Sequence, residues 1–336
     1  MDIGASDDDG TRNRPLSVWK ERDSIGGRAV DALVMILDGP GCTWSKKVGC
    51  TMCGYNNNVD RNAVSEKELL MQVEYAMDRY ESEPYIKIFT SGSFLDPNEI
   101  PKDAQISIIS KIGDAAPSSR VLVESRPEFI EDKQLAALRR FVADLEVAIG
   151  LESSSDIIRA RYIRKGFTYS QYAEGADLII DSGCLLKTYL LLKPPLLGEW
   201  GSMEDAKNSI ADIRDSFPGS RISVNPMNIQ TNTHVERLFA AGLYRPPWLW
   251  SLVDVLRQSK KETGKDIHLM SSPTAGGKRR GAHNCGKCDD VVLSGIGEFS
   301  ITNDVADLPA PQSCCYGKWE SLLMSSRVDP LSADRT

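Results

Sequence analysis

Short apolar runs alternate with amphipathic stretches along most of the chain. Runs that are rich in β-branched residues and bounded by polar turns predict strands. We place these strands at residues 32–37, 86–89, 120–124, 145–150, 185–192, 221–225 and 267–270. Between them, apolar residues recur at helical spacing. This spacing predicts helices at residues 65–80, 132–142, 169–183, 202–217 and 247–262. The first of these begins with Ser65 and Glu68, which are spaced as a capping box.

This alternation predicts an α/β protein with a parallel sheet and right-handed crossovers, either doubly wound or closed into a barrel. In both architectures, functional groups gather in the loops that follow the strands. Residues 1–14 are acidic, polar and glycine-containing, and this composition predicts a disordered tail.

The composition is that of a folded globular protein. A net charge of -7 argues against broad electrostatic capture of nucleic acid, although Lys278, Arg279 and Arg280 could form a local basic patch. The longest apolar stretches are too short to span a membrane and no leader sequence is evident, so we expect a cytoplasmic protein without a membrane partner. The eight cysteines then indicate metal binding or catalysis rather than a disulfide framework.

Cys42, Cys50 and Cys53 lie in the loop after the first expected strand. Zinc would need a fourth local ligand, yet the first histidine of the sequence is His234. Iron-sulfur clusters normally take four thiolates, so three would leave one iron open. Three structural thiols in a core are the alternative, which the surrounding Gly, Lys and Asn residues make less favourable.

A second cysteine group lies near the C-terminus. Cys285 and Cys288 enclose a glycine, as in a metal knuckle, and we expect them to bind zinc with His283 and Cys315. Cys314 is an alternative ligand, and an auxiliary iron-sulfur cluster is the alternative metal group. A zinc site here would fasten the C-terminal segment and contribute folding energy.

The first cysteine loop resembles a lengthened form of the three-cysteine motif of radical S-adenosylmethionine (SAM) enzymes, with seven residues between the first two thiols. In that superfamily the cysteines hold a 4Fe-4S cluster whose open iron is chelated by SAM. The resemblance implies a partial (β/α)6 radical SAM barrel over residues 15–272 and a C-terminal zinc-binding extension over residues 273–336.

Other strand ends resemble SAM-binding segments of the same superfamily. TSGSFLD follows the second strand, ESRPEF ends the third, and GLESSSD ends the fourth. A carboxylate can accept hydrogen bonds from ribose hydroxyls, and an arginine can pair with the methionine carboxylate. The residues expected to contact SAM are Ser91, Gly92, Ser93, Glu124, Arg126, Glu152, Arg159 and Lys165. Each charged residue could instead form an ordinary salt bridge.

These segments, with VWKERD, GCTWSKKVGCTMCGY and KRRGAHNCGKCD, are similar to the radical SAM subunits of archaeosine synthase over most of residues 15–320. The radical SAM domain of the Elongator catalytic subunit shares some of them. In the archaeosine family, a transferase subunit attaches lysine to 7-cyano-7-deazaguanine in the tRNA D-loop. The radical SAM subunit then cleaves a C-N bond of the adduct, leaving archaeosine.

The resemblance thus implies a lyase that binds a 4Fe-4S cluster, SAM and zinc, with modified tRNA, the transferase subunit and an electron donor as partners. Amide side chains suit the edge of a deazaguanine, and Lys193 could pair with the carboxylate of the adduct. The residues expected to contact the substrate are Tyr189, Lys193, Asn225, Asn228 and Gln230. Tyr189 is flanked by leucines and could instead be a core residue.

Three alternative functions remain open at this point. Methylthiolation would use a second iron-sulfur cluster, so iron at Cys285 and Cys288 would favour it. Acyl transfer to tRNA would need a further domain, for which the chain has no room. A non-catalytic zinc-binding subunit of an RNA complex would contain metal without iron.

Overall fold

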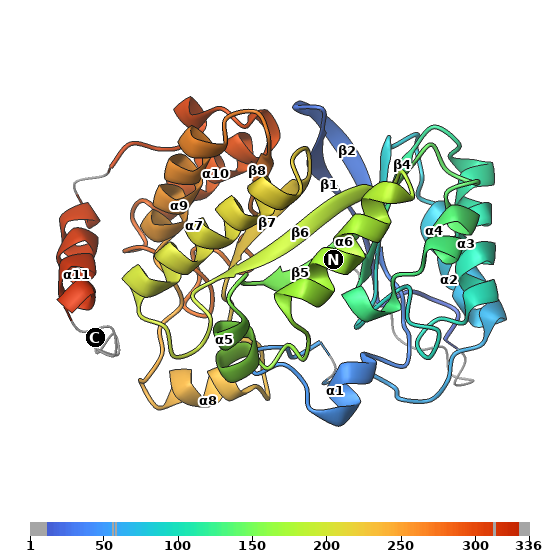
Figure 1. Ribbon diagram of the computed structural model, residues 1–336, viewed down its shortest axis with the longest axis horizontal. Helices are drawn as coiled ribbons and strands as arrows, with labels where there is room; N and C mark the ends of the chain where they lie inside the picture. The colour runs from blue at the N-terminus through green and yellow to red at the C-terminus, as the bar shows by residue number, and fades with distance from the viewer. Residues whose placement is uncertain (1–11, 56, 58, 312–313, 329–336) are drawn as a thin grey trace. The chain divides into compact units, whose positions relative to one another are not determined.

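The computed structural model describes residues 12–55, 57, 59–311 and 314–328, and Figure 1 labels their elements. The described strands follow one another in a single sheet in the order β1 to β8. They are β1 Ser17–Ile25, β2 Arg28–Ile36, β3 Tyr85–Phe89, β4 Arg120–Ser125, β5 Asp144–Glu152, β6 Leu185–Leu192, β7 Arg221–Pro226 and β8 His268–Met270. All seven strands expected from the sequence are present, so the period of the apolar runs identified them correctly.

The α-helices of the described chain lie between and after these strands. They are α1 Thr43–Lys47, α2 Glu66–Met77, α3 Lys102–Ala115, α4 Asp132–Leu138, α5 Asp156–Ile158, α6 Tyr169–Asp181, α7 Glu199–Ser216, α8 His234–Ala240, α9 Leu249–Thr263, α10 Asp289–Thr302 and α11 Tyr316–Val328. Short 3-10 helices lie at Pro127–Phe129 and Val305–Asp307, and a π-helical turn at Arg159–Ile163. Along the described chain, six strands are each followed by a helix: β2/α2, β3/α3, β4/α4, β5/α6, β6/α7 and β7/α9.

Sequence analysis missed β1, which pairs antiparallel with β2 from Ser17↔Ile36 to Ile25↔Arg28. The tight connection uses Gly26 and Gly27, whose φ angles of 59° and 75° suit glycine. The hydrophobic pattern did not predict this strand because its sequence, SVWKERDSI, contains no apolar run. Helices α3, α8, α10 and α11 were also missed; α3 alternates Ile with polar residues and so resembles a strand.

The chain forms two compact units, each built from several chain segments. Unit 1 comprises Met1–Val48, Tyr55–Gly150 and Ser170–Lys187, and unit 2 comprises Gly49–Gly54, Leu151–Tyr169 and Thr188–Thr336. Neither unit is a single continuous stretch of the sequence. Both units therefore depend on contacts between residues that are far apart in the chain.

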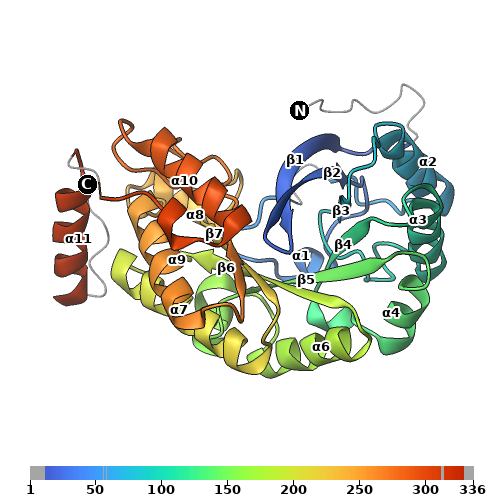
Figure 2. The same ribbon diagram turned by 90° about the horizontal axis from the view of Figure 1, so that it is seen from above.

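In unit 1, the central strands are parallel and in register, with Leu33↔Ile86 and Ile86↔Val121 as partners. These three side chains are fully buried. Helix α3 packs against both α2 and α4, and Figure 2 shows the three helices along the outer side of the strands. Their order places the loops after β2, β3 and β4 at one edge of this part of the sheet.

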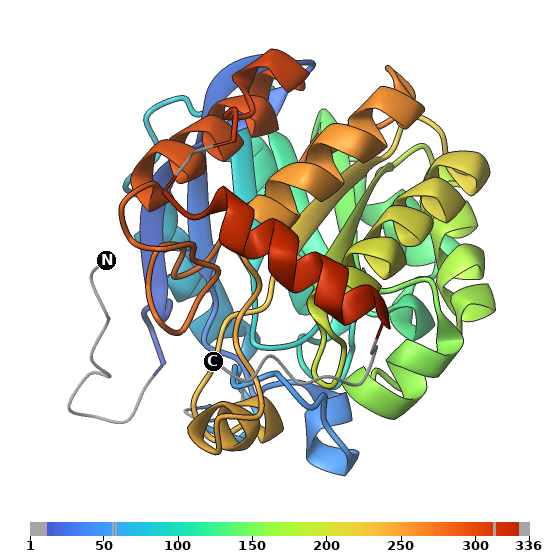
Figure 3. The same cartoon turned by 90° about the vertical axis from the view of Figure 1, so that its left-hand side faces the viewer.

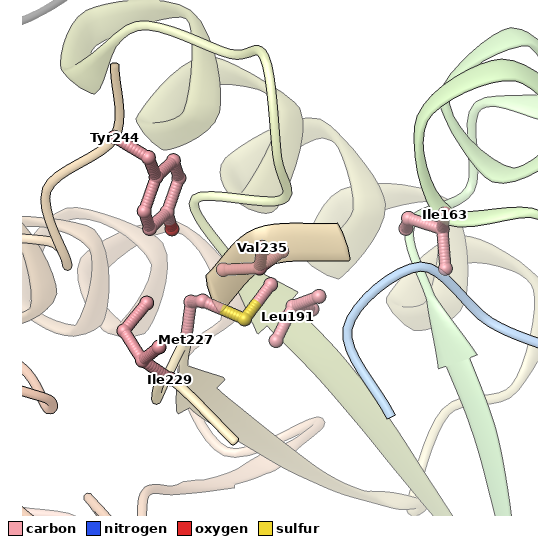
Figure 4. Packing of buried hydrophobic residues seen from close by; sticks show 6 residues of the cluster. All are labelled: Ile163, Leu191, Met227, Ile229, Val235 and Tyr244. Atoms are coloured by element: carbon pink, nitrogen blue, oxygen red, sulfur yellow. The ribbon is translucent and has the colours of Figure 1, made fainter. Parts of the chain in front are cut away.

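In unit 2, β7 and β8 are parallel, and α7 packs against α9 (Figure 1). A separate apolar cluster lies near the loops after β6 and β7 (Figure 4). Its buried members are Ile163, Leu191, Met227, Ile229, Val235 and Tyr244. Met52, between two of the cysteines of the first loop, packs against this cluster.

The segment expected to be a disordered tail covers residues 1–14, of which residues 1–11 lie outside the described part. Arg12 is only 8% exposed. Its guanidinium donates hydrogen bonds to the carbonyls of Asp60, Asn62 and Ala63, at 3.3, 3.0 and 2.7 Å. Arg12 is thus an ordered part of unit 1. No helix in the described ranges is long and apolar enough to cross a bilayer.

Candidate functional site

The first half of the cysteine loop belongs to unit 1. Cys42 precedes α1, and the backbone N of Thr43 donates to Glu99 Oε1 at 2.9 Å. The Thr43 hydroxyl also donates to Asp96. Glu99 Oε2 accepts a hydrogen bond from the backbone N of Ser93 at 2.6 Å. A buried carboxylate therefore joins the loop after β2 to the loop after β3.

Burial raises the pKa of Glu99 to about 7, although the amides of Ser93 and Thr43 favour its charged form. Burial also raises the pKa of the Cys42 thiol, although backbone hydrogen bonds near Ser45 and Trp44 favour its thiolate. Sequence analysis missed Glu99, because an acidic residue in a loop does not reveal its burial. Its hydrogen bonds with Thr43 and Ser93 identify it as a residue that joins the two loops.

Gly92 packs directly against the Glu99 carboxylate. A Cβ atom at residue 92 would be 1.9 Å from Glu99 Oε2. The position therefore requires glycine for packing against Glu99, in addition to the SAM contact expected for it from the sequence.

The end of β4 meets the same loop. The backbone N of Arg126 donates to Ser93 Oγ at 3.2 Å, and its Nε donates to Glu128 at 2.6 Å. The Arg126 guanidinium also lies 5.1 Å from the centre of the Trp44 ring, a cation-π distance. Unit 1 thus brings the loop that carries Ser91, Gly92 and Ser93 to the end of β4, where Glu124 and Arg126 lie.

The chain passes from unit 1 to unit 2 between Val48 and Gly49, so Cys50 and Cys53 belong to unit 2. Like Cys42, both are half-buried thiols rather than disulfides. Gln230 Oε1 accepts a hydrogen bond from the backbone N of Gly54. The residue after the last cysteine is therefore held by a side chain from the loop after β7.

Thr51 holds the other side of this loop. Its backbone N donates to the Ile163 carbonyl at 2.9 Å, and its hydroxyl donates to the Tyr162 carbonyl at 2.6 Å. Its own carbonyl accepts a hydrogen bond from the backbone N of His234 at 3.0 Å. Together with Met52 in the apolar cluster, these bonds fix the backbone between Cys50 and Cys53.

The SAM residues expected after β5 are all engaged in contacts within unit 2. Lys165 Nζ lies 2.7 Å from Glu152 Oε1. Arg159 is fully buried, and its guanidinium binds Asp156 and the carbonyl of Ser153. Their contacts with SAM stay predictions, with Glu152 and Lys165 more accessible than Arg159.

Two residues at strand ends have left-handed backbone conformations, which cost free energy outside glycine. They are Glu152, the last residue of β5, with φ of 71°, and Lys193, the residue after β6, with φ of 63°. Such conformations often occur at functional sites, where the surrounding contacts maintain them. Lys193 is 2% exposed and pairs with the fully buried Glu199 at 2.7 Å. Its expected contact with the substrate carboxylate stays a prediction.

The other expected substrate residues also lie in unit 2. Tyr189 is half-buried rather than part of the core. Asn225 Oδ1 accepts a hydrogen bond from Ser223 Oγ at 2.9 Å, and Asn228 is partly exposed. Gln230 contacts Gly54, so it belongs to the support of the cysteine loop as well as to the expected substrate side.

The second cysteine group comes together within unit 2. The Sγ atoms of Cys285, Cys288, Cys314 and Cys315 all lie within 4.8 Å of one another. His283 is not part of the group, and its Nδ1 lies 2.8 Å from the Gly281 carbonyl. The ligand set expected from the sequence included His283 and kept Cys314 as an alternative, whereas the structure gathers the four thiols.

No family model matches the chain. Curated relatives nevertheless match it over almost its whole length. The archaeosine synthase subunit beta of Methanosarcina acetivorans is 38% identical over 316 residues, covering 93% of this chain and 90% of the relative. The archaeosine synthase subunit beta of Thermococcus kodakarensis is 33% identical over 322 residues, covering 94% of this chain and 98% of the relative.

Solved structures share the fold at low sequence identity. Elp3 of the archaeon Methanocaldococcus infernus, with an N-terminal deletion, matches with a TM-score of 0.51 and 14% identity over 63% of this chain and 55% of that chain. SuiB of Streptococcus suis, bound to S-adenosylmethionine, matches with a TM-score of 0.52 and 12% identity over 71% of this chain and 49% of that chain. These likenesses confirm the expected fold class, the partial (β/α)6 radical SAM barrel. On the sequence identity and coverage of its curated relatives, the chain belongs to the archaeosine synthase subunit beta family.

Proposed function

We propose that this protein is a radical SAM lyase that cleaves a C-N bond in a lysine adduct of 7-cyano-7-deazaguanine in the tRNA D-loop, giving archaeosine. The observation that carries the proposal is the set Cys42, Cys50 and Cys53 after β2, in a chain of the archaeosine synthase subunit beta family. A non-catalytic subunit would have no need for three half-buried thiols supported by Glu99 and Gln230.

The donor set fits a 4Fe-4S cluster with one open iron, because three thiolates are available in this loop. The charged residues that would contact SAM are Glu124, Arg126, Glu152 and Lys165. When bound, the cluster and SAM would supply a 5'-deoxyadenosyl radical that removes a hydrogen atom from the lysine-derived side chain.

The chain's own residues would position these groups and exclude water. Thr51 and Gln230 hold the Cys50–Cys53 backbone, while Glu99 holds the segment after Cys42. The stacking of Arg126 on Trp44 restricts its guanidinium, so less freedom is lost when it binds a carboxylate. On the substrate side, Tyr189, Asn225 and Asn228 would contact the base.

Phosphate contacts would come from Lys278 and Arg279, which are exposed. Arg280 is a less favourable phosphate contact, because its guanidinium pairs with Glu236 at 2.6 Å and donates to the Ile229 carbonyl at 3.0 Å. The word "subunit" in the relatives' name supports a complex with a second subunit. We propose that this partner is the transferase, acting with an electron donor in the cytoplasm.

The test is anaerobic reconstitution of the whole chain, followed by iron and sulfide analysis and by assays of SAM cleavage and archaeosine formation on tRNA carrying the lysine adduct. We expect a 4Fe-4S spectrum and dithionite-dependent cleavage of SAM in the wild type, and loss of both in Cys50→Ala. Cys184→Ala is the matched control, because this thiol belongs to neither group. A wild type without a cluster, or Cys50→Ala with full cleavage, would refute the proposal.

A further inference from the structure

The four C-terminal thiols are spaced as ligands of one ion. The Sγ–Sγ distances are 3.5 Å for Cys285–Cys314, 3.6 Å for Cys288–Cys315, 3.8 Å for Cys314–Cys315 and 4.0 Å for Cys285–Cys288. Thiolates in a tetrahedron around zinc lie about 3.8 Å apart, since each Zn–S bond is about 2.3 Å. The observed distances bracket this value, and disulfide sulfurs would be only about 2.05 Å apart.

The same spacing argues against an auxiliary iron-sulfur cluster. In a 4Fe-4S cluster each thiolate binds a different iron, so the four sulfurs lie farther apart than when they share one ion. Here all four lie within 4.8 Å of one another. A tetrahedral set of four thiolates suits zinc, which has no redox chemistry and is almost always four-coordinate in structural sites.

The backbone of the first ligand pair is held by the protein itself. Gly286, between Cys285 and Cys288, has a φ of 84°, which favours glycine. The Asp289 carboxylate is 3% exposed and accepts hydrogen bonds from the backbone N of Asn284 at 3.1 Å and of Gly286 at 3.0 Å. The turn that presents the two thiols is thus largely formed in advance of metal binding.

Two N–H groups point at the sulfurs. Trp250 Nε1 lies 3.3 Å from Cys315 Sγ, and Asn284 Nδ2 lies 3.5 Å from Cys288 Sγ. Such donors stabilise metal-bound thiolates and orient them. Trp250 is buried on α9, and its backbone N donates to Asn284 Oδ1 at 3.2 Å. The thiol group therefore contacts α9 through Trp250.

Helix α11 begins directly after Cys315, and Figure 3 looks onto this helix. The Tyr316 ring packs edge-on against Trp250 with centroids 5.4 Å apart. Trp319 Nε1 donates to Ser251 Oγ at 2.8 Å. Over residues 316–326, the buried side chains are Trp319 and Ser326. Helix α11 also packs against α7. Because so few of its side chains are buried, a helix of this length is marginal by itself, and attachment at its start would stabilise it.

We propose that Cys285, Cys288, Cys314 and Cys315 bind one zinc ion. This ion fastens the start of α11 to the Cys285–Cys288 turn, which contacts Trp250 of α9 through Asn284. His283 is then not a ligand, because its ring contacts Gly281 and lies outside the thiol group. The inference does not depend on the radical chemistry, since it rests on residues that the proposed reaction does not use.

Zinc content tests the ligand set. We expect about one zinc per chain in the wild type, as for a structural site, and at least about a tenfold loss in Cys314→Ser. Cys314 is exposed, so this substitution should not disturb the core. His283→Ala is the matched control and should keep its zinc. Retention of zinc in Cys314→Ser with loss in His283→Ala would overturn the ligand set. A wild type that binds no zinc, and more iron than one 4Fe-4S cluster contains, would overturn the identity of the metal.

Hydrogen exchange tests the attachment of α11. Removing zinc from the wild type with a chelator should raise exchange at least about tenfold in residues 316–328, with little change in β7. Unchanged exchange in α11 after the zinc has left would overturn the attachment. The Cys42→Ala, Cys50→Ala, Cys53→Ala triple variant should lose iron and retain zinc, so that failure of the reaction and failure of this site are measured separately.

Discussion

At the scale of single residues, Gln230 shows how one side chain can join two parts of the site. Sequence analysis placed it among the substrate contacts because amide side chains suit the edge of a deazaguanine. The structure adds a contact with the backbone N of Gly54, one residue after Cys53. The Thr233 hydroxyl donates to the Gln230 carbonyl at 2.8 Å and so holds this residue in turn. We therefore treat Gln230 as a residue that positions the cysteine loop.

Gln230→Met should loosen this loop, because it leaves the Gly54 N–H without its acceptor at a cost of about 1–3 kcal/mol. We expect faster loss of the reconstituted cluster in air and an altered EPR spectrum of its reduced state.

Gln230→Glu retains an acceptor oxygen and should restore both properties largely to wild-type values. Gln258→Met is a control on α9, since Gln258 pairs with Asp254 at the surface. Equal cluster lifetimes and spectra in Gln230→Met and the wild type would show that this hydrogen bond does not support the cluster.

At the scale of elements, the loop after β3 depends on an approach that only glycine permits. The chain places a buried carboxylate, Glu99, over Gly92 and joins it to the backbone of Thr43 and Ser93. The SGS sequence alone is typical of any turn. Its close packing arises from Glu99, which reaches it from a position several residues later in the same loop.

Gly92→Ala should displace Glu99, because the new methyl group would occupy the space of its carboxylate. We expect a loss of about 1–3 kcal/mol in the free energy of unfolding, together with a several-fold rise in the dissociation constant for SAM measured by calorimetry.

The matched control is Gly201→Ala on α7, where a Cβ would have no heavy atom within 4 Å. Because alanine favours helices over glycine, this control should be neutral or stabilising by up to about 1 kcal/mol. A Gly92→Ala protein as stable and as tightly bound to SAM as the wild type would contradict the packing argument.

At the scale of the whole molecule, the charge balance bears on how tRNA would be recognised. The net charge is -7, and the exposed basic pair Lys278 and Arg279 is a small local feature. Electrostatic binding of nucleic acid depends on the number of phosphates that are neutralised. We therefore expect the proposed partner subunit to supply most of the tRNA affinity.

Replacing Lys278 and Arg279 with Gln should weaken tRNA binding by the complex and reduce the slope of log K against log salt by about 2, one for each lost cation. Fluorescence anisotropy over a salt series measures both quantities. Lys102→Gln in unit 1 is a control, because Lys102 pairs with Glu131 at the surface. An unchanged slope in the double variant would place the phosphate contacts elsewhere.

The sequence by itself determined the seven strands with apolar runs, the α/β class and the position of the C-terminal cysteine group, because periodicity and residue spacing are local properties of the chain. It did not reveal β1, whose charged segment is a strand only through pairing with β2. Nor could it identify Glu99 as buried, attach Gln230 to Gly54, or place Cys314 rather than His283 beside the other three thiols. Each of these depends on contacts between separate segments, which form only when the tertiary fold brings those segments together.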